Sequence, residues 1–236
     1  MASSASLMET LFNILYLATV WILVALMAKR RPGVPAAKAE MADRFLLSLF
    51  LLAAGDSFHV GFRVVGEIVG FDAAYITIGG IRSSLLGLGM LATAYTMTGF
   101  YMVLADARRL RSGKKADAAF WVIQALLGLR FILMALPGNS WESPVPPYAM
   151  GLVRNLPLAL AGFLMAYLFI SEGLASRDRA WAGIGWAMVA SYAFYTPVIL
   201  FAAKIPALGL LMIPKTIAYL VMAFIAYRAY FLEKRT

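Results

Sequence analysis

Seven long apolar stretches dominate this sequence and constrain its fold more than any other feature. Each is close to the roughly 20 residues that an α-helix needs to cross the hydrocarbon core of a bilayer. They cover, approximately, residues 7–27, 45–69, 78–104, 118–136, 150–170, 180–202 and 207–229. Because the connections between them are short, the sequence predicts one domain over residues 1–236, an all-α integral membrane protein built as a seven-transmembrane-helix bundle.

The composition supports a membrane protein and excludes several other classes. Hydrophobic residues make up 62% of the chain and charged residues only 14%, with a mean hydropathy of +0.79. The net charge of +9 does not indicate nucleic-acid binding, because the basic residues gather between the apolar stretches. With no cysteine and one histidine, the chain offers no conventional ligand set for a metal. We therefore expect no metal and no cofactor.

The distribution of basic residues predicts the topology. Cytoplasmic loops of membrane proteins are enriched in lysine and arginine. Fifteen of the 21 basic residues lie beside the first, third and fifth connections or in the C-terminal tail. These are Lys29, Arg30, Arg31, Lys38, Arg44, Arg108, Arg109, Arg111, Lys114, Lys115, Arg177, Arg179, Arg228, Lys234 and Arg235. We expect the N-terminus outside and the C-terminus in the cytoplasm, in a bacterial inner membrane or a plasma membrane.

The six remaining cations fall in the outer half of the predicted bundle. At 1.5 Å per residue, Arg130 and Lys215 lie closest to the midplane, whereas Arg82 and Lys204 lie near the outer interface, where long side chains can reach water. The remaining two are Arg63 and Arg154. Charges deep in a membrane are costly and mark a protein interior or a water-filled cavity.

One helix face carries a polar stripe. Asp56, His59, Arg63 and Glu67 are spaced by three, four and four residues, which places them along one side of a helix. The stripe is either a self-neutralising ladder that holds helices together or the wall of a cavity that opens outward. Even if both acids are paired, four of the six outer cations still lack an anion. The charge balance favours an anionic ligand, with Asp56 and His59 as a protonatable pair.

The sequence thus predicts a binding protein of receptor or transporter type. Its ligand would be an anionic or amphiphilic small molecule, such as a carboxylate or a lipid head group. Its other partners would be membrane lipids, and a homo-oligomer is left open. The predicted ligand-binding residues are Asp56, His59, Arg63, Arg130, Arg154, Asn155, Tyr192, Tyr195 and Lys215. A structural subunit without a ligand is a further alternative.

An intramembrane enzyme that modifies lipids is the main alternative function. His59 would be the general base, oriented by Asp56, while the arginines would stabilise a developing negative charge. These two residues are therefore the candidate catalytic pair. The nucleophile is not obvious, because Ser57 points away from the stripe and Ser83 and Ser84 have no special context.

A lysine in the seventh helix gives a weaker third alternative. Lys215, the helix count and the tyrosine and proline content of the sixth helix are similar to those of microbial rhodopsins. That resemblance implies a retinal Schiff base on Lys215. The chain departs from the family at Leu211, where rhodopsins carry an aspartate, and in the third helix, where it has no central acid.

Overall fold

The chain folds into a bundle of seven long helices, as expected. A computed structural model describes residues 4–113, 116–202 and 204–232. All seven helices are long and apolar enough to cross a membrane, so the chain is a multi-pass membrane protein. The helices are α1 (Ser4–Arg30), α2 (Ala36–Val69), α3 (Leu85–Arg111), α4 (Ala118–Ala135), α5 (Tyr148–Ala175), α6 (Arg179–Phe201) and α7 (Met212–Phe231). Short 3₁₀ turns are η1 (Arg31–Gly33), η2 (Pro137–Asn139) and η3 (Pro206–Leu211).

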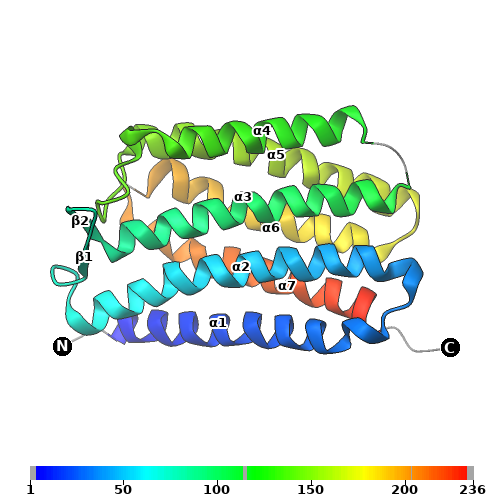
Figure 1. The fold of residues 1–236 in the computed structure, drawn as a ribbon, viewed down its shortest axis with the longest axis horizontal. Coiled ribbons are helices and arrows are strands. Elements are labelled where there is room, and N and C mark those ends of the chain that lie inside the picture. Colours follow the sequence, from blue (N-terminus) through cyan, green and yellow to red (C-terminus); the bar gives the residue numbers. More distant parts are fainter. Residues whose placement is uncertain (1–3, 114–115, 203, 233–236) are drawn as a thin grey trace.

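The helices form a closed ring in chain order. Each helix packs on the next along the chain, and α7 returns to contact both α1 and α2. Figure 1 shows α1 to α4 in front and α5 to α7 behind them. Because the number of helices is odd, α1 begins at the opposite end of the bundle from the end of α7 (Figure 1). Which end faces the cytoplasm remains a prediction from the basic residues.

The third predicted helix begins later than expected. Residues 78–84 were predicted to be helical, but β1 (Tyr75–Ile78) and β2 (Ile81–Ser84) form an antiparallel hairpin, and α3 begins at Leu85. Gly79 and Gly80 join the strands with φ values of 56° and 83°, which suit a tight hairpin turn. The β-branched residues on either side favour strands. The hairpin lies at the end of the bundle where α2 ends (Figure 1).

The seventh helix also begins later than its apolar stretch. Residues 206–211 form η3, and α7 begins at Met212. Pro214 therefore lies in the first turn of α7, where its missing N–H has no intrahelical acceptor to lose. Lys215 follows Pro214 in the same first turn of α7. Pro157 and Pro197, by contrast, lie inside α5 and α6.

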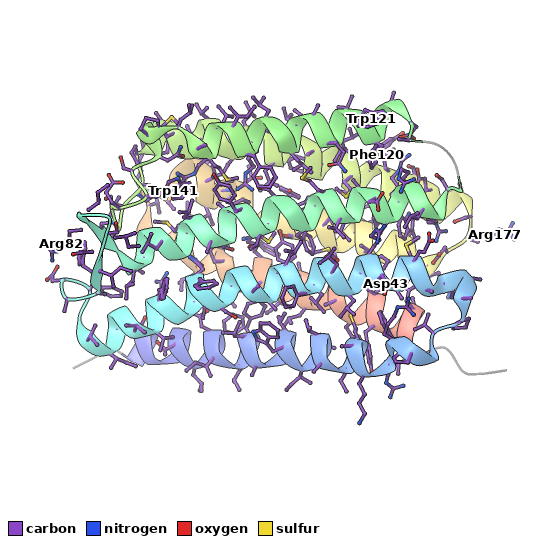
Figure 2. All side chains as sticks on the ribbon, in the orientation of Figure 1. Asp43, Arg82, Phe120, Trp121, Trp141 and Arg177 are labelled. Carbon is purple, nitrogen blue, oxygen red and sulfur yellow. The ribbon has the colours of Figure 1, made fainter. Side chains whose placement is uncertain are left out.

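Ion pairs cross-link the end of the bundle opposite the hairpin. Arg108 is buried and pairs with Asp117 at 2.8 Å and Glu172 at 2.7 Å. Hydrogen bonds from Arg108 and from the Phe120 amide lower the pKa of Asp117 to about 2. Further pairs are Arg31–Asp43, Arg44–Asp106, Arg109–Asp106 and Arg111–Asp178. Figure 2 labels Asp43 and Arg177 toward this end. Of the fifteen basic residues assigned to this side, Lys114, Lys115, Lys234 and Arg235 lie outside the described residues.

Candidate functional site

A large cavity lies within the helix ring, toward the hairpin end. Its volume is about 510 Å³, and all seven helices contribute to its lining, together with Trp141 and η3. Figure 2 places Trp141 toward the hairpin end. Each of the nine residues predicted from the sequence to bind ligand lines this single cavity. The cavity therefore brings together, from five helices, the polar residues that looked anomalous in the sequence.

Arg130 is buried and is held by neutral oxygens. From α4, its Nη1 donates to the Ala94 carbonyl at 2.9 Å and to the Thr98 hydroxyl at 2.5 Å, both on α3. Toward α5, Nε donates to the Arg154 carbonyl at 3.1 Å and Nη2 donates to the Asn155 side-chain oxygen at 3.2 Å. These acceptors fix the guanidinium between three helices but do not neutralise its charge.

Arg154 is likewise anchored by groups that carry no charge. Its Nη1 donates to Oδ1 of Asn139 at 3.0 Å, and its guanidinium carbon lies 4.2 Å from the ring centroid of Trp141. Asn139 is buried and also donates to the carbonyls of Leu133 and Leu136. The connection between α4 and α5 is thus tied to Arg154, which faces the cavity from the following helix.

Lys215, in the first turn of α7, contacts aromatic rings from α6 and α7. Its Nζ lies 4.4 Å from the ring centroid of Tyr195 and 5.6 Å from that of Tyr219. Within residues 4–113, 116–202 and 204–232, no carboxylate forms an ion pair with Lys215, Arg130 or Arg154. Ring faces attract a cation but leave its N–H donors available. Lys215 is therefore the cavity cation best placed to donate hydrogen bonds to a ligand.

Asp56 is the carboxylate of the cavity lining, and it is bound from other helices. The Tyr16 hydroxyl on α1 donates to Oδ2 at 2.5 Å, and the Thr93 hydroxyl on α3 donates to Oδ1 at 3.1 Å. In the alternative of a self-neutralising ladder, Asp56 would pair with His59 instead. The observed bonds use Asp56 to join α1, α2 and α3, while the side chain still faces the cavity.

His59 has an unsatisfied nitrogen. It lines the cavity, and its Nδ1 is buried with no hydrogen-bond partner among the described residues. Buried polar atoms in proteins nearly always have a partner. Arg63, one turn further, lines the same cavity, whereas Glu67 accepts a hydrogen bond from Thr10 and is not part of the lining. The stripe therefore divides, with three residues in the cavity and one at the contact between α1 and α2.

The two cations assigned to the outer interface lie elsewhere. Arg82 is exposed on β2, where its guanidinium carbon lies 4.2 Å from the ring centroid of Tyr75. Lys204 is exposed in the turn after α6. Neither residue lines the cavity. They are suitable controls for charge substitutions inside it.

Tyrosines close the deep side of the cavity. The hydroxyls of Tyr101 and Tyr219 lie 3.1 Å apart, and the Tyr192 hydroxyl donates to the Leu158 carbonyl at 3.1 Å. Tyr192 fits against α5 because residue 162 is glycine, since a Cβ there would overlap the tyrosine ring and hydroxyl. Tyr192 and Tyr195, both predicted to bind ligand, thus belong to a larger tyrosine cluster.

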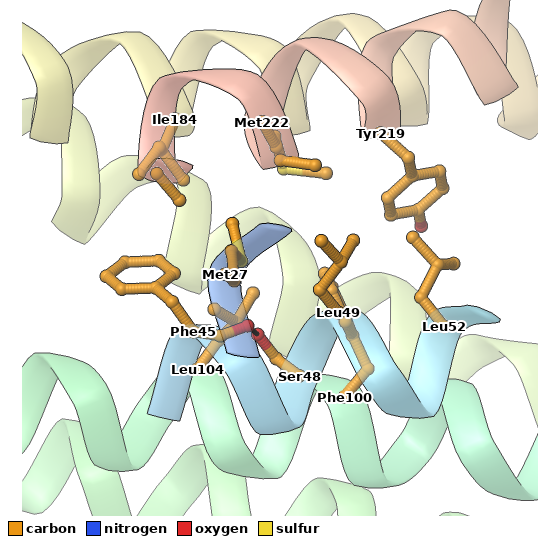
Figure 3. Close-up of a pocket in the computed structure, with 12 residues that line it drawn as sticks. Met27, Phe45, Ser48, Leu49, Leu52, Phe100, Leu104, Ile184, Tyr219 and Met222 are labelled. Atoms are coloured by element: carbon orange, nitrogen blue, oxygen red, sulfur yellow. Dashed lines mark hydrogen bonds between the residues drawn. The ribbon is translucent and has the colours of Figure 1, made fainter. Parts of the chain in front are cut away.

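A second, smaller cavity lies beyond Tyr219. It holds about 20 Å³ and is lined almost wholly by apolar side chains from α1, α2, α3, α6 and α7. Figure 3 shows Tyr219 at one end of it, with Met222 and Ile184 further along and Ser48 below. Because Tyr219 lines both cavities, it lies between the polar cavity and the smaller, mainly apolar one.

Several lining side chains were missed from the sequence. Tyr16, Thr93 and Tyr219 line the cavity beside the predicted residues. Tyrosine and threonine are common in membrane helices, so their type alone carries no signal. Only the one-turn spacing of Tyr219 from Lys215 on α7 could have indicated that they share a face.

The described residues contain no cluster of three or more histidine or acidic side chains that could hold a metal ion. No family model, curated protein or solved structure matches this chain. The chemistry of the cavity is therefore what indicates a function.

Proposed function

We propose that this membrane protein binds an anionic or amphiphilic small molecule in the large cavity, which faces outward, and acts as a receptor or a transporter. One observation carries the proposal. Arg130, Arg154 and Lys215 line a cavity in which Asp56 is the single carboxylate among the described lining residues. Buried charges are usually retained in proteins when they are paired with an opposite charge. An anion in the cavity would be that partner.

The way the two arginines are held strengthens the electrostatic argument. Neutral carbonyl, hydroxyl and amide oxygens fix Arg130 and Arg154 in position. A fixed cation away from bulk water attracts an anion more strongly than one at a wet interface, since the effective dielectric constant is lower. Because these side chains are already held in place, ligand binding costs less of their conformational entropy. Lys215, whose Nζ lies over the rings of Tyr195 and Tyr219, would complete the anion contacts.

The remaining lining suggests the body of the ligand. A volume of about 510 Å³ lies within the range of about 300–1,000 Å³ usual for small-molecule sites. Tyr16, Trp141, Tyr195 and Tyr219 present ring surfaces to it. Such a lining suits a molecule with an anionic head and a flat or apolar body. Asp56 and His59 would contact a polar group on that body, which makes use of the unpartnered Nδ1 of His59.

The two other sequence-based functions receive less support. The serines considered as nucleophiles for a lipid-modifying enzyme, Ser57, Ser83 and Ser84, do not line the cavity. For a retinal Schiff base on Lys215, Asp56 would be the counter-ion, but Arg130 and Arg154 line the same cavity. Nearby cations disfavour another positive charge. An anionic ligand turns the same cations into binding groups.

A shape-matched ligand panel tests the proposal. The protein in lipid nanodiscs is heated with acetate, benzoate or octanoate, each compared with its neutral amide. A ligand present at 100 times its Kd stabilises the folded state by about 2.7 kcal/mol, so a binding carboxylate raises the melting temperature. Lys215→Gln and Arg154→Gln should remove the rise. Lys204→Gln and Arg82→Gln make the same changes of charge outside the cavity and should retain it.

Two outcomes contradict the proposal. The first is that amides stabilise the protein as much as carboxylates across the panel. The second is that the cavity substitutions reduce stabilisation no more than their matched controls.

A further inference from the structure

A second cationic hollow lies at the opposite end of the bundle from the large cavity. It has a volume of about 270 Å³ and is lined by the end of α1, the turn into α2, and the end of α7. Its charged lining residues are all basic: Lys29, Arg30 and Lys38. Tyr230 and Phe231 form its aromatic side. The hollow shares no lining residue with the large cavity.

Two of these cations, Lys29 and Arg30, differ from most arginines at this end because they form no ion pair within the described residues. Arg31, Arg44, Arg108, Arg109 and Arg111 are paired with carboxylates. Lys29 and Arg30 are exposed and form no ion pair with a carboxylate in the part of the chain that the structure describes. The guanidinium carbon of Arg30 instead lies 5.7 Å from the ring centroid of Tyr227 on α7. Within the described residues, the protein's own acids thus pair with these five arginines but not with Lys29 or Arg30.

The backbone adds to the positive character of the hollow. Gly33, Val34 and Pro35 line it immediately before α2 begins at Ala36. No side chain caps this helix start, because the N-cap residue is Pro35. An uncapped helix N-terminus presents backbone N–H groups and a partial positive charge, which favour an anion. Basic side chains and a helix start therefore act on the same volume.

We propose that this hollow binds the phosphate-containing head group of an anionic phospholipid. The hollow lies where a membrane-spanning helix ends, and aromatic residues with basic neighbours are typical of the membrane interface. Lys29 and Arg30 contact the phosphate, while Tyr230 and Phe231 pack along the glycerol and upper acyl region. On the predicted topology this is a lipid of the cytoplasmic leaflet, where basic clusters bind anionic lipids. The proposal is independent of the ligand assigned to the large cavity.

Retention of lipid by the purified protein tests this inference. The protein is equilibrated with mixed micelles containing equal amounts of dioleoylphosphatidylglycerol and dioleoylphosphatidylcholine, and bound lipids are counted by native mass spectrometry. The wild type should retain phosphatidylglycerol preferentially. Each basic side chain near a lipid surface contributes about fivefold to binding, so Lys29→Gln combined with Arg30→Gln should weaken retention about 30-fold.

The matched control removes the same charge from the same end of the bundle. Arg177 and Arg179 are exposed and do not line the hollow, so Arg177→Gln combined with Arg179→Gln should leave retention unchanged. Exchanging the two cations, Lys29→Arg with Arg30→Lys, should preserve binding and shows that charge is the cause. Rising salt should release the lipid from the wild type.

Three results would overturn the inference. They are an equal loss in both double variants, an unchanged preference after Lys29→Gln with Arg30→Gln, and complete displacement of the lipid by millimolar inorganic phosphate. The last result would identify a site for free phosphate instead of a lipid head group.

Discussion

Nε of Arg130 donates a hydrogen bond to the backbone carbonyl of Arg154 at 3.1 Å. One cavity arginine therefore helps to position α5, the helix on which the other cavity arginine lies. The same guanidinium reaches Ala94 and Thr98 on α3. Arg130 thus joins α3, α4 and α5 around the cavity. It has a structural role in addition to the charge that it contributes.

This double role predicts a large loss of stability for Arg130→Gln. The shorter side chain leaves buried oxygens without donors, and each unsatisfied buried group costs about 1–3 kcal/mol. We expect the free energy of unfolding to fall by at least about 2 kcal/mol, measured by denaturant titration of helicity in nanodiscs. Arg82→Gln is the control, because exposed substitutions usually change stability by less than about 0.5 kcal/mol. Similar losses for the two variants would show that the Arg130 hydrogen bonds do not hold the helices.

The contact between Gly162 and Tyr192 gives a second prediction. Alanine at residue 162 must displace the tyrosine ring, and overpacking of this kind costs about 1–3 kcal/mol. Gly128→Ala is the matched control, because no described neighbouring atom lies within 4 Å of a Cβ there. In a helix interior that change should stabilise the protein by up to about 1 kcal/mol. Thermal unfolding should show a lower melting temperature for Gly162→Ala and a higher one for Gly128→Ala. Equal changes in melting temperature would contradict the packing described for α5 and α6.

Asp117 gives a pH-dependent prediction at the other end of the bundle. Hydrogen bonds from Arg108 and from the Phe120 amide lower its pKa from 3.8 to about 2. A depressed folded-state pKa stabilises the protein above the unfolded value, and the contribution is lost as the pH falls from about 4 through about 2. Because the Asp117 side chain is 49% exposed, the effect should be modest, about 1 kcal/mol or less.

Asp117→Asn isolates this charge, since asparagine can still accept the N-cap hydrogen bond from Phe120. The variant should be less stable than the wild type at pH 7, and the difference should shrink as the pH falls from 4 to 2. Unfolding measured across that range checks it. A difference that stays constant down to pH 2 would mean that the charge on Asp117 is not the cause.

The charges of the site could be predicted from the sequence because an ionisable side chain in an apolar segment is conspicuous. Helical spacing then related Asp56, His59 and Arg63, and counting residues from the helix ends placed Arg130 and Lys215 at similar depth. The structure adds their common cavity. It also separates Glu67 from the stripe, because Thr10 on α1 binds it, and no spacing rule within α2 could reveal that contact.

The partners of these charges could not be predicted. Arg130 is bound mainly by backbone carbonyls and one hydroxyl, and every residue has a carbonyl, so no residue type signals the contact. The hairpin was missed for a different reason. Its residues are apolar enough to extend a membrane window, although the Gly79–Gly80 pair between β-branched residues is a recognisable hairpin signal.

The orientation of the bundle can be measured with engineered cysteines, because the chain has none of its own. Val145 is exposed in the connection before α5, and Arg177 is exposed in the turn after it. If the basic end is cytoplasmic, Val145→Cys reacts with a membrane-impermeant maleimide on intact cells, while Arg177→Cys reacts only after permeabilisation. The reverse pattern would place the large cavity on the cytoplasmic side.

Identification of the molecule that the cavity holds tests the central claim most directly. The protein is purified in mild detergent, and small molecules released on denaturation are compared by mass spectrometry between wild type, Lys215→Gln with Arg154→Gln, and the matched Lys204→Gln with Arg82→Gln. An anion near stoichiometric amount in the wild type and the control, and depleted in the cavity variant, is the predicted result. A neutral or cationic molecule depleted in the same way, or an anion equally abundant in all three proteins, would contradict the proposed function.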